Sequence, residues 1–201
     1  RLTDVTGVQT CALPISFIYN HFIRPIVSKP RSTINFPRIM NEGKIFLVNL
    51  AKGCLGSRNA DMLGMFLINR LFLAALSRYS IPAEQRRKFT LYIDEFQNFT
   101  TDNVAHIFAE ARKFNLSLIC ANQNLFQLKK EICNSALGTV GNLLCFRPGV
   151  SDVDIIGKYF EPEFDEKDLL NLPNFHVISR MLVNDVPCKP FLFQTLPIEK
   201  K

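Results

Sequence analysis

Short apolar runs alternate with stretches of helical periodicity along most of this chain. Four runs, residues 44–50, 89–93, 116–121 and 142–146, are apolar without the alternation of a half-exposed strand, which is typical of strands buried on both faces. Stretches with apolar residues at helical spacing separate them. This alternation predicts an α/β fold in which a parallel sheet is flanked by helices.

The intervening helices are expected to begin at polar caps. Asn59 predicts the start of a helix that runs to about residue 79, residues 102–114 form a second helix, and Ser151 caps a short later one. The helix after Asn59 is apolar on most faces, but Arg70 interrupts it and its apolar stretch falls short of the about 20 residues that cross a bilayer. It is therefore predicted to be a buried core helix.

The two ends of the chain differ from this pattern. Residues 17–43 contain three prolines and predict a short helix or extended arm followed by a loop. Residues 176–183 and 191–195 read as late antiparallel strands around a turn at 184–187. Residues 1–16 resemble a translated sequencing-library adaptor, and we exclude them from the fold.

Composition excludes several classes of protein. The 201 residues are 47% hydrophobic and 21% charged, the balance of a globular domain, and the net charge of +6 is compatible with an anionic partner such as nucleic acid. The six cysteines form no Cys-x-x-Cys or zinc-type spacing and predict reduced core thiols in a cytosolic compartment. The three histidines are isolated, and no metal cluster is expected.

Each predicted strand carries polar residues at or just beyond its carboxyl end. They are Asn49, Asp94 with Glu95, Asn122 with Gln123, and Arg147. Ligands of open parallel sheets bind beyond the carboxyl ends of the strands, so we expect these four groups to meet at one rim. There Asp94 would hold Mg²⁺ through water, Glu95 would orient and deprotonate the attacking water, and Gln123 would sense the γ-phosphate of a nucleotide.

Three of these segments resemble motifs of one protein family. Residues 91–99 (LYIDEFQNF), 109–114 (AEARKF) and 121–124 (ANQN) resemble the Walker B, arginine and glutamine motifs of TraG/TraD-type type IV coupling proteins. These are conjugative DNA-transfer ATPases related to the HerA/FtsK group of RecA-like motors. The similarity covers residues 31–198 and includes further stretches at 43–53, 141–149, 160–164 and 168–173.

The resemblance implies a function and its cofactors. It implies a homo-hexameric pump, driven by ATP and Mg²⁺, that moves single-stranded DNA at the inner membrane and engages relaxase or relaxosome proteins and a type IV secretion channel. The chain would belong to the cytoplasmic domain of such a membrane protein. Arg112 matches the arginine offered to the ATP of a neighbouring subunit, where a cation stabilises charge on the transferred phosphoryl group. Arg147 is a second candidate for that role.

One motif of such motors is missing from the sequence. The pattern G-x-x-x-x-G-K-[ST] occurs nowhere, because Gly43-Lys44 is followed by Ile and Gly157-Lys158 by Tyr. Residues 44–198 are therefore predicted to be the C-terminal half of a RecA-like ATPase domain, unable by itself to bind ATP tightly or to hydrolyse it. Without the sheet neighbours of the other half, an apolar edge should be exposed.

Two alternatives and the DNA contacts stay open. The chain could be a non-catalytic docking module for relaxosome or accessory proteins, or part of a HerA-type motor for repair or chromosome segregation. The basic residues and the aromatic residues allow nucleic-acid binding. The aromatic ones are expected in the core more readily than on DNA, and the basic ones are as easily a solvated face (Arg86, Arg87, Lys88, Lys113, Lys129 and Lys130; Phe114, Phe126 and Phe175).

Overall fold

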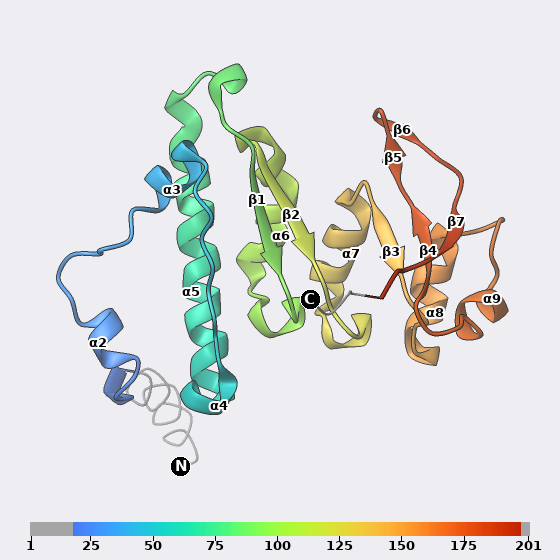
Figure 1. The fold of residues 1–201 in the computed structure, drawn as a ribbon, viewed down its shortest axis with the longest axis horizontal. Helices are drawn as coiled ribbons and strands as arrows, with labels where there is room; N and C mark the ends of the chain where they lie inside the picture. Colours follow the sequence, from blue (N-terminus) through green and yellow to red (C-terminus); the bar gives the residue numbers. More distant parts are fainter. Residues whose placement is uncertain (1–17, 198–201) are drawn as a thin grey trace, which may run out of the picture. The chain divides into compact units, whose positions relative to one another are not determined.

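The fold was determined as a computed structural model, which describes residues 18–197 (Figure 1). The adaptor-like residues 1–16 lie outside the described part. The chain forms two compact units: unit 1 comprises the residues up to 101 together with 110–120, and unit 2 comprises 102–109 and the residues from 121 onward. The division of the sequence into an arm over 17–43 and one half-domain over 44–198 stays a prediction.

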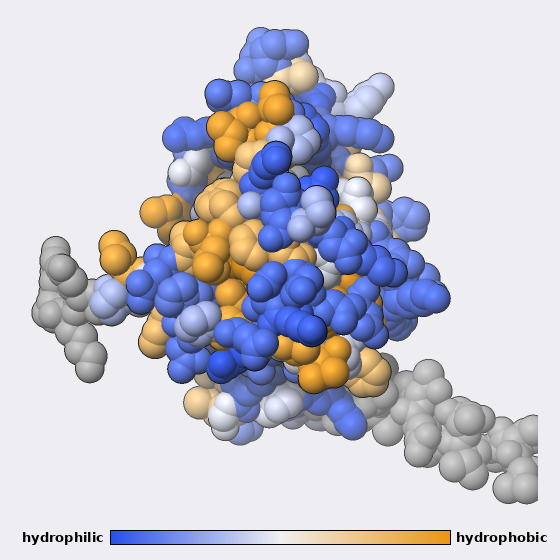
Figure 2. Space-filling view, turned by 90° about the vertical axis from the view of Figure 1, so that its right-hand side faces the viewer, coloured by the Kyte–Doolittle hydropathy of each residue, from blue (hydrophilic) through white to orange (hydrophobic). Residues whose placement is uncertain are grey.

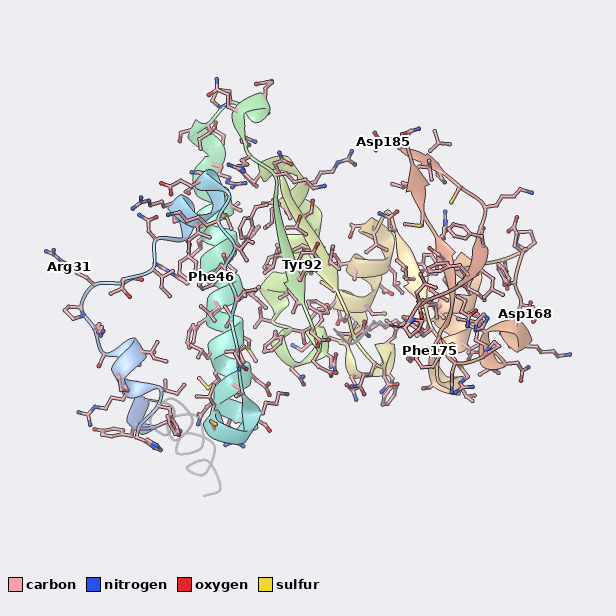
Figure 3. The ribbon with its side chains drawn as sticks, viewed as in Figure 1. Arg31, Phe46, Tyr92, Asp168, Phe175 and Asp185 are labelled. Atoms are coloured by element: carbon pink, nitrogen blue, oxygen red, sulfur yellow. The ribbon has the colours of Figure 1, made fainter. Side chains whose placement is uncertain are left out.

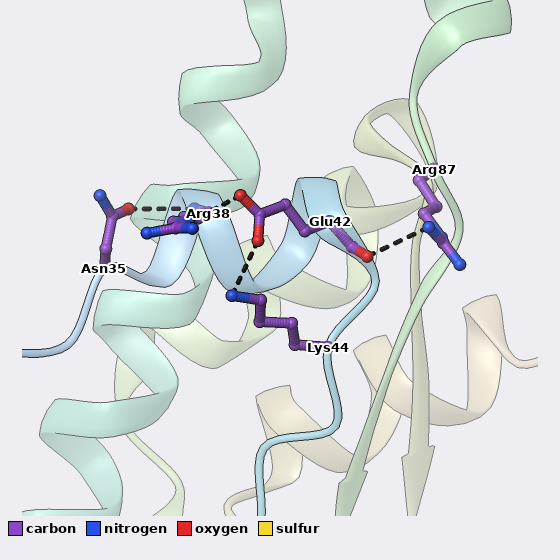
Figure 4. Close-up of polar contacts among 5 residues, drawn as sticks. All are labelled: Asn35, Arg38, Glu42, Lys44 and Arg87. Carbon is purple, nitrogen blue, oxygen red and sulfur yellow. Dashed lines mark hydrogen bonds and ion pairs between the residues drawn. The ribbon is translucent and has the colours of Figure 1, made fainter.

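Unit 1 begins with two short helices. Helix α2 spans Arg24–Val27, and α3 spans Phe36–Glu42 in a region expected to be partly loop. The Asn35 side chain accepts a hydrogen bond from the Arg38 amide at the start of α3, and Gly43 ends the helix with a φ of 66°. Figure 4 shows how Glu42 at this end binds the side chains of Arg38 and Lys44.

The strand expected over residues 44–50 is wrong. The segment is extended and pairs with no strand in the described part of the chain, and Ile45 and Leu47 are each 88% exposed. A run becomes a strand only when a neighbour takes its backbone hydrogen bonds, and sequence pattern alone does not supply that neighbour. The segment instead lies along helix α5, where the ring of Phe46 meets that of Phe36 edge-on at 5.8 Å (Figure 3).

Helix α5 is the long central helix of unit 1. It spans Ser57–Leu76, continues as the 3₁₀ helix η1 (Ser77–Ser80), and follows the short α4 (Lys52–Leu55). The predicted cap was wrong by three residues, because Gly56 precedes the helix and the Asn59 amide donates to the Leu55 carbonyl. One face is buried through small and apolar residues (Ala60, Gly64, Ile68, Leu71, Ala74 and Ala75).

By length and hydropathy alone, α5 together with η1 is long and apolar enough to cross a membrane. Residues Ser57–Ser80 have a mean hydropathy of 1.4 in their most apolar window, and a third of that window is buried. Within unit 1 this helix packs against α3, α4 and the 3₁₀ helix η3 (Phe96–Phe99). The side chains of Leu50 and Phe99 fill the space over Gly64, so a side chain at that position would collide with Phe99.

The sheet of unit 1 has two parallel strands. As predicted, β1 spans Phe89–Ile93 and β2 spans Leu116–Cys120, and the register runs from Phe89 opposite Leu116 to Ile93 opposite Cys120. The 3₁₀ helices η2 (Ala83–Gln85) and η4 (Ala111–Phe114) precede β1 and β2, and η3 (Phe96–Phe99) follows β1. Tyr92 on β1, labelled in Figure 3, is 71% exposed, and the exposed apolar edge that the sequence predicts stays a prediction.

Unit 2 contains shorter elements than expected. The helix predicted over 102–114 ends earlier: α6 spans Asp102–Glu110, and the chain then tightens into η4. The Ser135 hydroxyl of α7 (Lys130–Thr139) donates to the Ala105 carbonyl and joins α7 to α6. The other helical elements are η5 (Leu125–Gln127), α7 (Lys130–Thr139), α8 (Val150–Ile156), η6 (Gly157–Tyr159) and α9 (Glu166–Leu170).

The strands of unit 2 are antiparallel. Strand β3 (Leu143–Cys145) pairs with β4 (His176–Arg180), which pairs with β7 (Phe191–Gln194). The expectation that β3 joins the parallel sheet is wrong, because its hydrogen bonds go to β4. The sheet covers a core of Cys145, Ile156, Phe160, Leu169, Leu172 and Ile178.

A small hairpin ends the sheet region. Strands β5 (Leu182–Val183) and β6 (Val186–Pro187) flank Asn184 and Asp185, whose φ angles are 53° and 61°. Such paired positive angles suit a two-residue hairpin turn. The turn expected over 184–187 is therefore confirmed at 184–185, whereas Val186 and Pro187 belong to β6. Figure 2 shows hydrophobic side chains gathered among hydrophilic ones on the face turned to the viewer. Val183, Val186 and Leu192 are among the exposed apolar residues of these strands.

Candidate functional site

The acidic pair lies directly beyond the carboxyl end of β1. Asp94 is exposed, and its Oδ1 accepts a hydrogen bond of 3.0 Å from the Glu95 amide. Glu95 is half-buried, has a φ of 51°, and its Oε2 accepts 2.6 Å from the Gln97 amide nitrogen. A left-handed glutamate is uncommon, and such conformations concentrate at functional sites. The turn thus presents one open and one oriented carboxylate side by side.

These two carboxylates have the chemistry for the cation and base roles predicted for them. A single exposed carboxylate suits Mg²⁺, which takes hard oxygen ligands and retains several waters. The oriented carboxylate of Glu95 suits a base for a water molecule. No group of three or more His, Cys, Asp or Glu side chains that could enclose a metal occurs within residues 18–197.

The register of β1 and β2 brings two candidate segments to the same edge of the sheet. Ile93 lies opposite Cys120, so the chain leaves both strands at the same carboxyl edge. Asp94 follows at once on β1, whereas Gln123 follows three residues after β2, where the chain enters unit 2. Gln123 is exposed, and its approach to the acidic pair stays a prediction.

A buried carboxylate in unit 2 holds the segment after Gln123. Asp152 is 3% exposed, and its two oxygens accept hydrogen bonds from the backbone amides of Leu125 (2.8 Å) and Phe126 (3.1 Å). These amides open η5, so Asp152 caps the turn that starts two residues beyond Gln123. Sequence reasoning missed this residue because nothing in a lone aspartate 27 positions away indicates its partner.

Arg112 lies at the other edge of the parallel pair. It belongs to η4, which leads into the amino-terminal end of β2, whereas Asp94 and Glu95 follow the carboxyl end of β1. A five-residue strand is about 16 Å long at about 3.3 Å per residue. The Arg112 side chain is exposed, and no hydrogen bond or ion pair engages it within the described residues. This guanidinium is therefore available to a group outside its own unit.

Arg147, the second arginine candidate, is engaged within unit 2. Its Nη1 donates to the Leu172 carbonyl at 3.2 Å, and its Nη2 donates to the Asn174 side chain at 3.0 Å. Both terminal nitrogens therefore hold the chain ahead of β4. The expected rim of four strand ends is also wrong in part: Asn49 follows no strand, and Arg147 follows a strand paired antiparallel.

The aromatic and basic candidates for DNA binding divide between inner and outer positions. Phe126 and Phe175 are 79% and 69% exposed, so the expectation that they lie in the core is wrong. Phe114 is half-buried beneath the Arg86 guanidinium, which lies 5.6 Å from its ring centre. Arg87 donates to the Glu42 carbonyl at 3.1 Å (Figure 4). Of the predicted basic run, Arg86 and Arg87 thus serve contacts within unit 1.

The cysteines of the described part are free thiols, and most are at least partly buried, as predicted. Cys54 is exposed, contrary to expectation. Burial raises the pKa of the Cys120 thiol to about 12, and burial together with the nearby Asp152 charge raises the pKa of Cys145 to about 12. Neither thiol is a nucleophile at neutral pH.

Comparisons with known proteins establish the fold. No protein-family model and no curated protein sequence matches the chain. Among solved structures, the bacterial conjugative coupling protein TrwB is similar with a TM-score of 0.57 and 14% identity over 72% of this chain and 38% of TrwB. The genome packaging NTPase B204 of Sulfolobus turreted icosahedral virus 2 is similar with a TM-score of 0.55 and 14% identity, over 93% of this chain and 94% of B204. The chain has a P-loop NTPase fold.

Two further solved structures are also similar, and one of them contains a bound nucleotide. VirB4 of Thermoanaerobacter pseudethanolicus is similar with a TM-score of 0.50 and 16% identity over 73% of this chain and 39% of VirB4. TrwB also matches in a form complexed with ADP and Mg²⁺, at a TM-score of 0.53 and 15% identity over 71% of this chain and 36% of that one. The chain therefore spans a little over a third of the length of TrwB.

Proposed function

We propose that this chain is the C-terminal part of the ATPase domain of a type IV coupling protein that pumps single-stranded DNA during conjugation. The observation that carries the proposal is the Asp94–Glu95 turn beyond the carboxyl end of β1, in a fold shared with nucleotide-bound TrwB. Ligands of such sheets bind at this edge. The whole protein would be a homo-hexamer in the inner membrane, with this part in the cytoplasm, and would meet relaxase and a secretion channel.

Each candidate residue has a role in this proposal. Asp94 would hold Mg²⁺ through water, Glu95 would take the proton of the attacking water, and Gln123 would report the γ-phosphate. Bound Mg²⁺ and ATP supply the phosphoryl group and neutralise its charge. Arg112 would serve the nucleotide of a neighbouring subunit, because its turn lies at the opposite edge of the sheet from the carboxylates. The hydrogen bonds of Arg147 favour a structural role for it.

The decisive experiment uses the coding sequence extended upstream to include a phosphate-binding loop. We expect the extended protein to hydrolyse ATP faster with single-stranded DNA, and Glu95→Gln to lower kcat by about 10²-fold or more while nucleotide binding persists. Glu84→Gln, an exposed acid of η2 in the same unit, is the matched control. Turnover at the parental rate in Glu95→Gln would remove Glu95 from the mechanism.

The same assay separates the alternative motor. A HerA-type motor for repair or segregation would respond to duplex DNA at least as strongly as to single strands. The chain without its upstream part lacks the phosphate loop, so we expect it to show no ATP hydrolysis above background. Measurable turnover by the chain alone would contradict this.

A docking function is the second candidate, and one observation favours it. Unit 2 exposes apolar side chains on β5, β6 and β7, with Val183, Val186 and Leu192 each at least 47% exposed. Exposed apolar patches of this kind mark protein interaction sites. If unit 2 only docks a relaxosome protein, Val186→Lys would abolish that binding and leave DNA-stimulated turnover unchanged.

A further inference from the structure

Unit 1 contains a buried cation that no acid neutralises. Arg78 in η1 has 0% exposure, and no ion pair engages it within residues 18–197. Its Nε donates to the Asn41 side chain at 3.0 Å, and its Nη1 donates to the carbonyls of Arg87 (3.0 Å) and Phe114 (3.1 Å). Desolvation, aided by the charge of Arg86, lowers the pKa of Arg78. Backbone carbonyls take the place of a counter-ion here.

A second arginine, Arg86, also binds a carbonyl of η4, the turn that contains Phe114. The Nε of Arg86 donates to the carbonyls of Ile81 (2.8 Å) and Arg78 (3.2 Å), and its Nη1 donates to the Lys113 carbonyl. Its guanidinium stacks over Phe114. In return, the Asn115 side chain donates 2.6 Å to the Arg86 carbonyl. We call Arg78, Arg86 and Asn115 the arginine brace.

The arginine brace grips the last two residues of η4. Arg78 binds the carbonyl of Phe114 and Arg86 that of Lys113, at the carbonyl end of the turn, where positive charge is favourable. Asn115 stops the turn with a φ of 56°, and its amide donates to the Arg112 carbonyl at 3.1 Å. The residue just before these anchored carbonyls is Arg112, whose own side chain is exposed and unengaged.

We propose that Arg78 and Arg86 are positioning residues for Arg112, and that they fix the turn from which Arg112 reaches the nucleotide of a neighbouring subunit. This inference rests on the function proposed above. A buried guanidinium is costly, and apolar residues stabilise a fold at least as well where only packing matters. The donors of a planar guanidinium, however, fix the orientation of the carbonyls that they bind. A turn that is already held in place loses little conformational entropy when one of its side chains binds a ligand.

The test is subunit mixing in the upstream-extended protein. We expect Arg78→Ala and Arg86→Ala each to lower kcat about tenfold or more with the KM for ATP unchanged, because a misplaced group acts on the transition state. Mixing either variant with Glu95→Gln should restore turnover to up to about a quarter of the parental rate. In a ring assembled at random from equal amounts, about a quarter of the interfaces join a subunit with an intact Glu95 to a neighbour whose Arg112 is correctly positioned. Mixing either with Arg112→Ala should restore nothing.

Three variants separate positioning from general loss of structure. Arg87→Ala removes a neighbouring arginine that binds Glu42 rather than η4, and it should keep parental turnover. Arg78→Lys keeps a cation with fewer directed donors and should recover part of the activity that Arg78→Ala loses. Should Arg78→Ala fail to fold, Arg86→Ala decides the matter, because Arg86 is only half-buried.

Hydrogen exchange of this chain adds a readout that needs no catalysis. Amides of residues 112–115 should exchange at least about tenfold faster in Arg86→Ala than in the parent or in Arg87→Ala. Those of β1 beyond Phe89, whose own amide donates to the Asn115 carbonyl, should stay unchanged. Unchanged exchange there, parental turnover of folded Arg78→Ala and Arg86→Ala, or failure of both to complement Glu95→Gln would each overturn the inference. If the extended protein had no ATPase activity, the proposed function would be wrong. The exchange result would still decide whether the arginine brace holds the turn.

Discussion

Each unit holds a candidate loop through a buried charged side chain, which is a cation in unit 1 and an anion in unit 2. In both units that side chain binds backbone groups. In unit 1 the buried cation Arg78 binds the Phe114 carbonyl that ends a 3₁₀ turn and the carbonyl of Arg87, and in unit 2 the buried anion Asp152 binds the amides that begin a 3₁₀ turn. Neither charge is neutralised by an oppositely charged side chain in the described part of the chain. Backbone dipoles at turn ends are therefore sufficient to keep a buried charge, provided that two or more donors or acceptors converge on it.

The largest expected effect falls on unit 1. Arg78→Ala leaves three part-buried acceptors without their donor and empties a buried position, and we expect it to lower the free energy of unfolding by about 3 kcal/mol. Chemical denaturation with a probe in unit 1 would measure this. A loss below about 1 kcal/mol would show that the carbonyls find other donors and would break the comparison.

The loss in the free energy of unfolding expected from removing Asp152 in unit 2 is smaller, because only two hydrogen bonds to backbone amides are lost. Asp152→Ala leaves the amides of Leu125 and Phe126 unsatisfied, which should cost about 2 kcal/mol. Asp152→Asn retains one acceptor and should lose about half as much. Equal losses in the two variants would mean that the charge, rather than the geometry of two acceptors, holds the turn.

Each unit also contains one thiol whose pKa is raised to about 12, Cys120 in unit 1 and Cys145 in unit 2. A folded-state pKa above the unfolded value of about 9 means that the native state retains its proton longer, so stability is full below pH 9 and falls as the pH rises toward 12. Between pH 9 and pH 10 the ionisation of each thiol should lower the free energy of unfolding by about 1 kcal/mol. Denaturation at both pH values, with Cys120→Ala and Cys145→Ala, would assign that loss to a unit.

The smallest effect concerns the exposed pairs at the end of α3. Hydrogen bonds from Lys44 and Arg38 lower the pKa of Glu42, so its contribution is present at neutral pH and disappears as the pH falls below about 4.5. Because the carboxylate is fully exposed, Glu42→Gln should change the melting temperature less than any variant above. A loss matching that of Asp152→Asn would contradict the view that buried charges dominate.

The local patterns of this chain could be predicted, and the long-range partners could not. Strands β1 and β2 and the turn at Asn184 and Asp185 follow from residue types at neighbouring positions. The strand expected over 44–50 failed because a strand depends on a neighbour that its own sequence does not specify.

The candidate site divides in the same way. Asp94 and Glu95 are predictable because their role follows from the strand that precedes them. Arg78 and Asp152 were missed because their partners are backbone groups 9 to 36 and 26 to 27 residues away, and backbone groups leave no trace in the residue types.

The unpaired segment over residues 44–50 has a practical consequence for anyone who produces this chain alone. An extended run with apolar side chains turned to water is a template on which further copies can add, edge to edge. Expression of the isolated chain should therefore yield inclusion bodies at high concentration. Replacement of Ile45 and Leu47 by lysine should keep it in the supernatant.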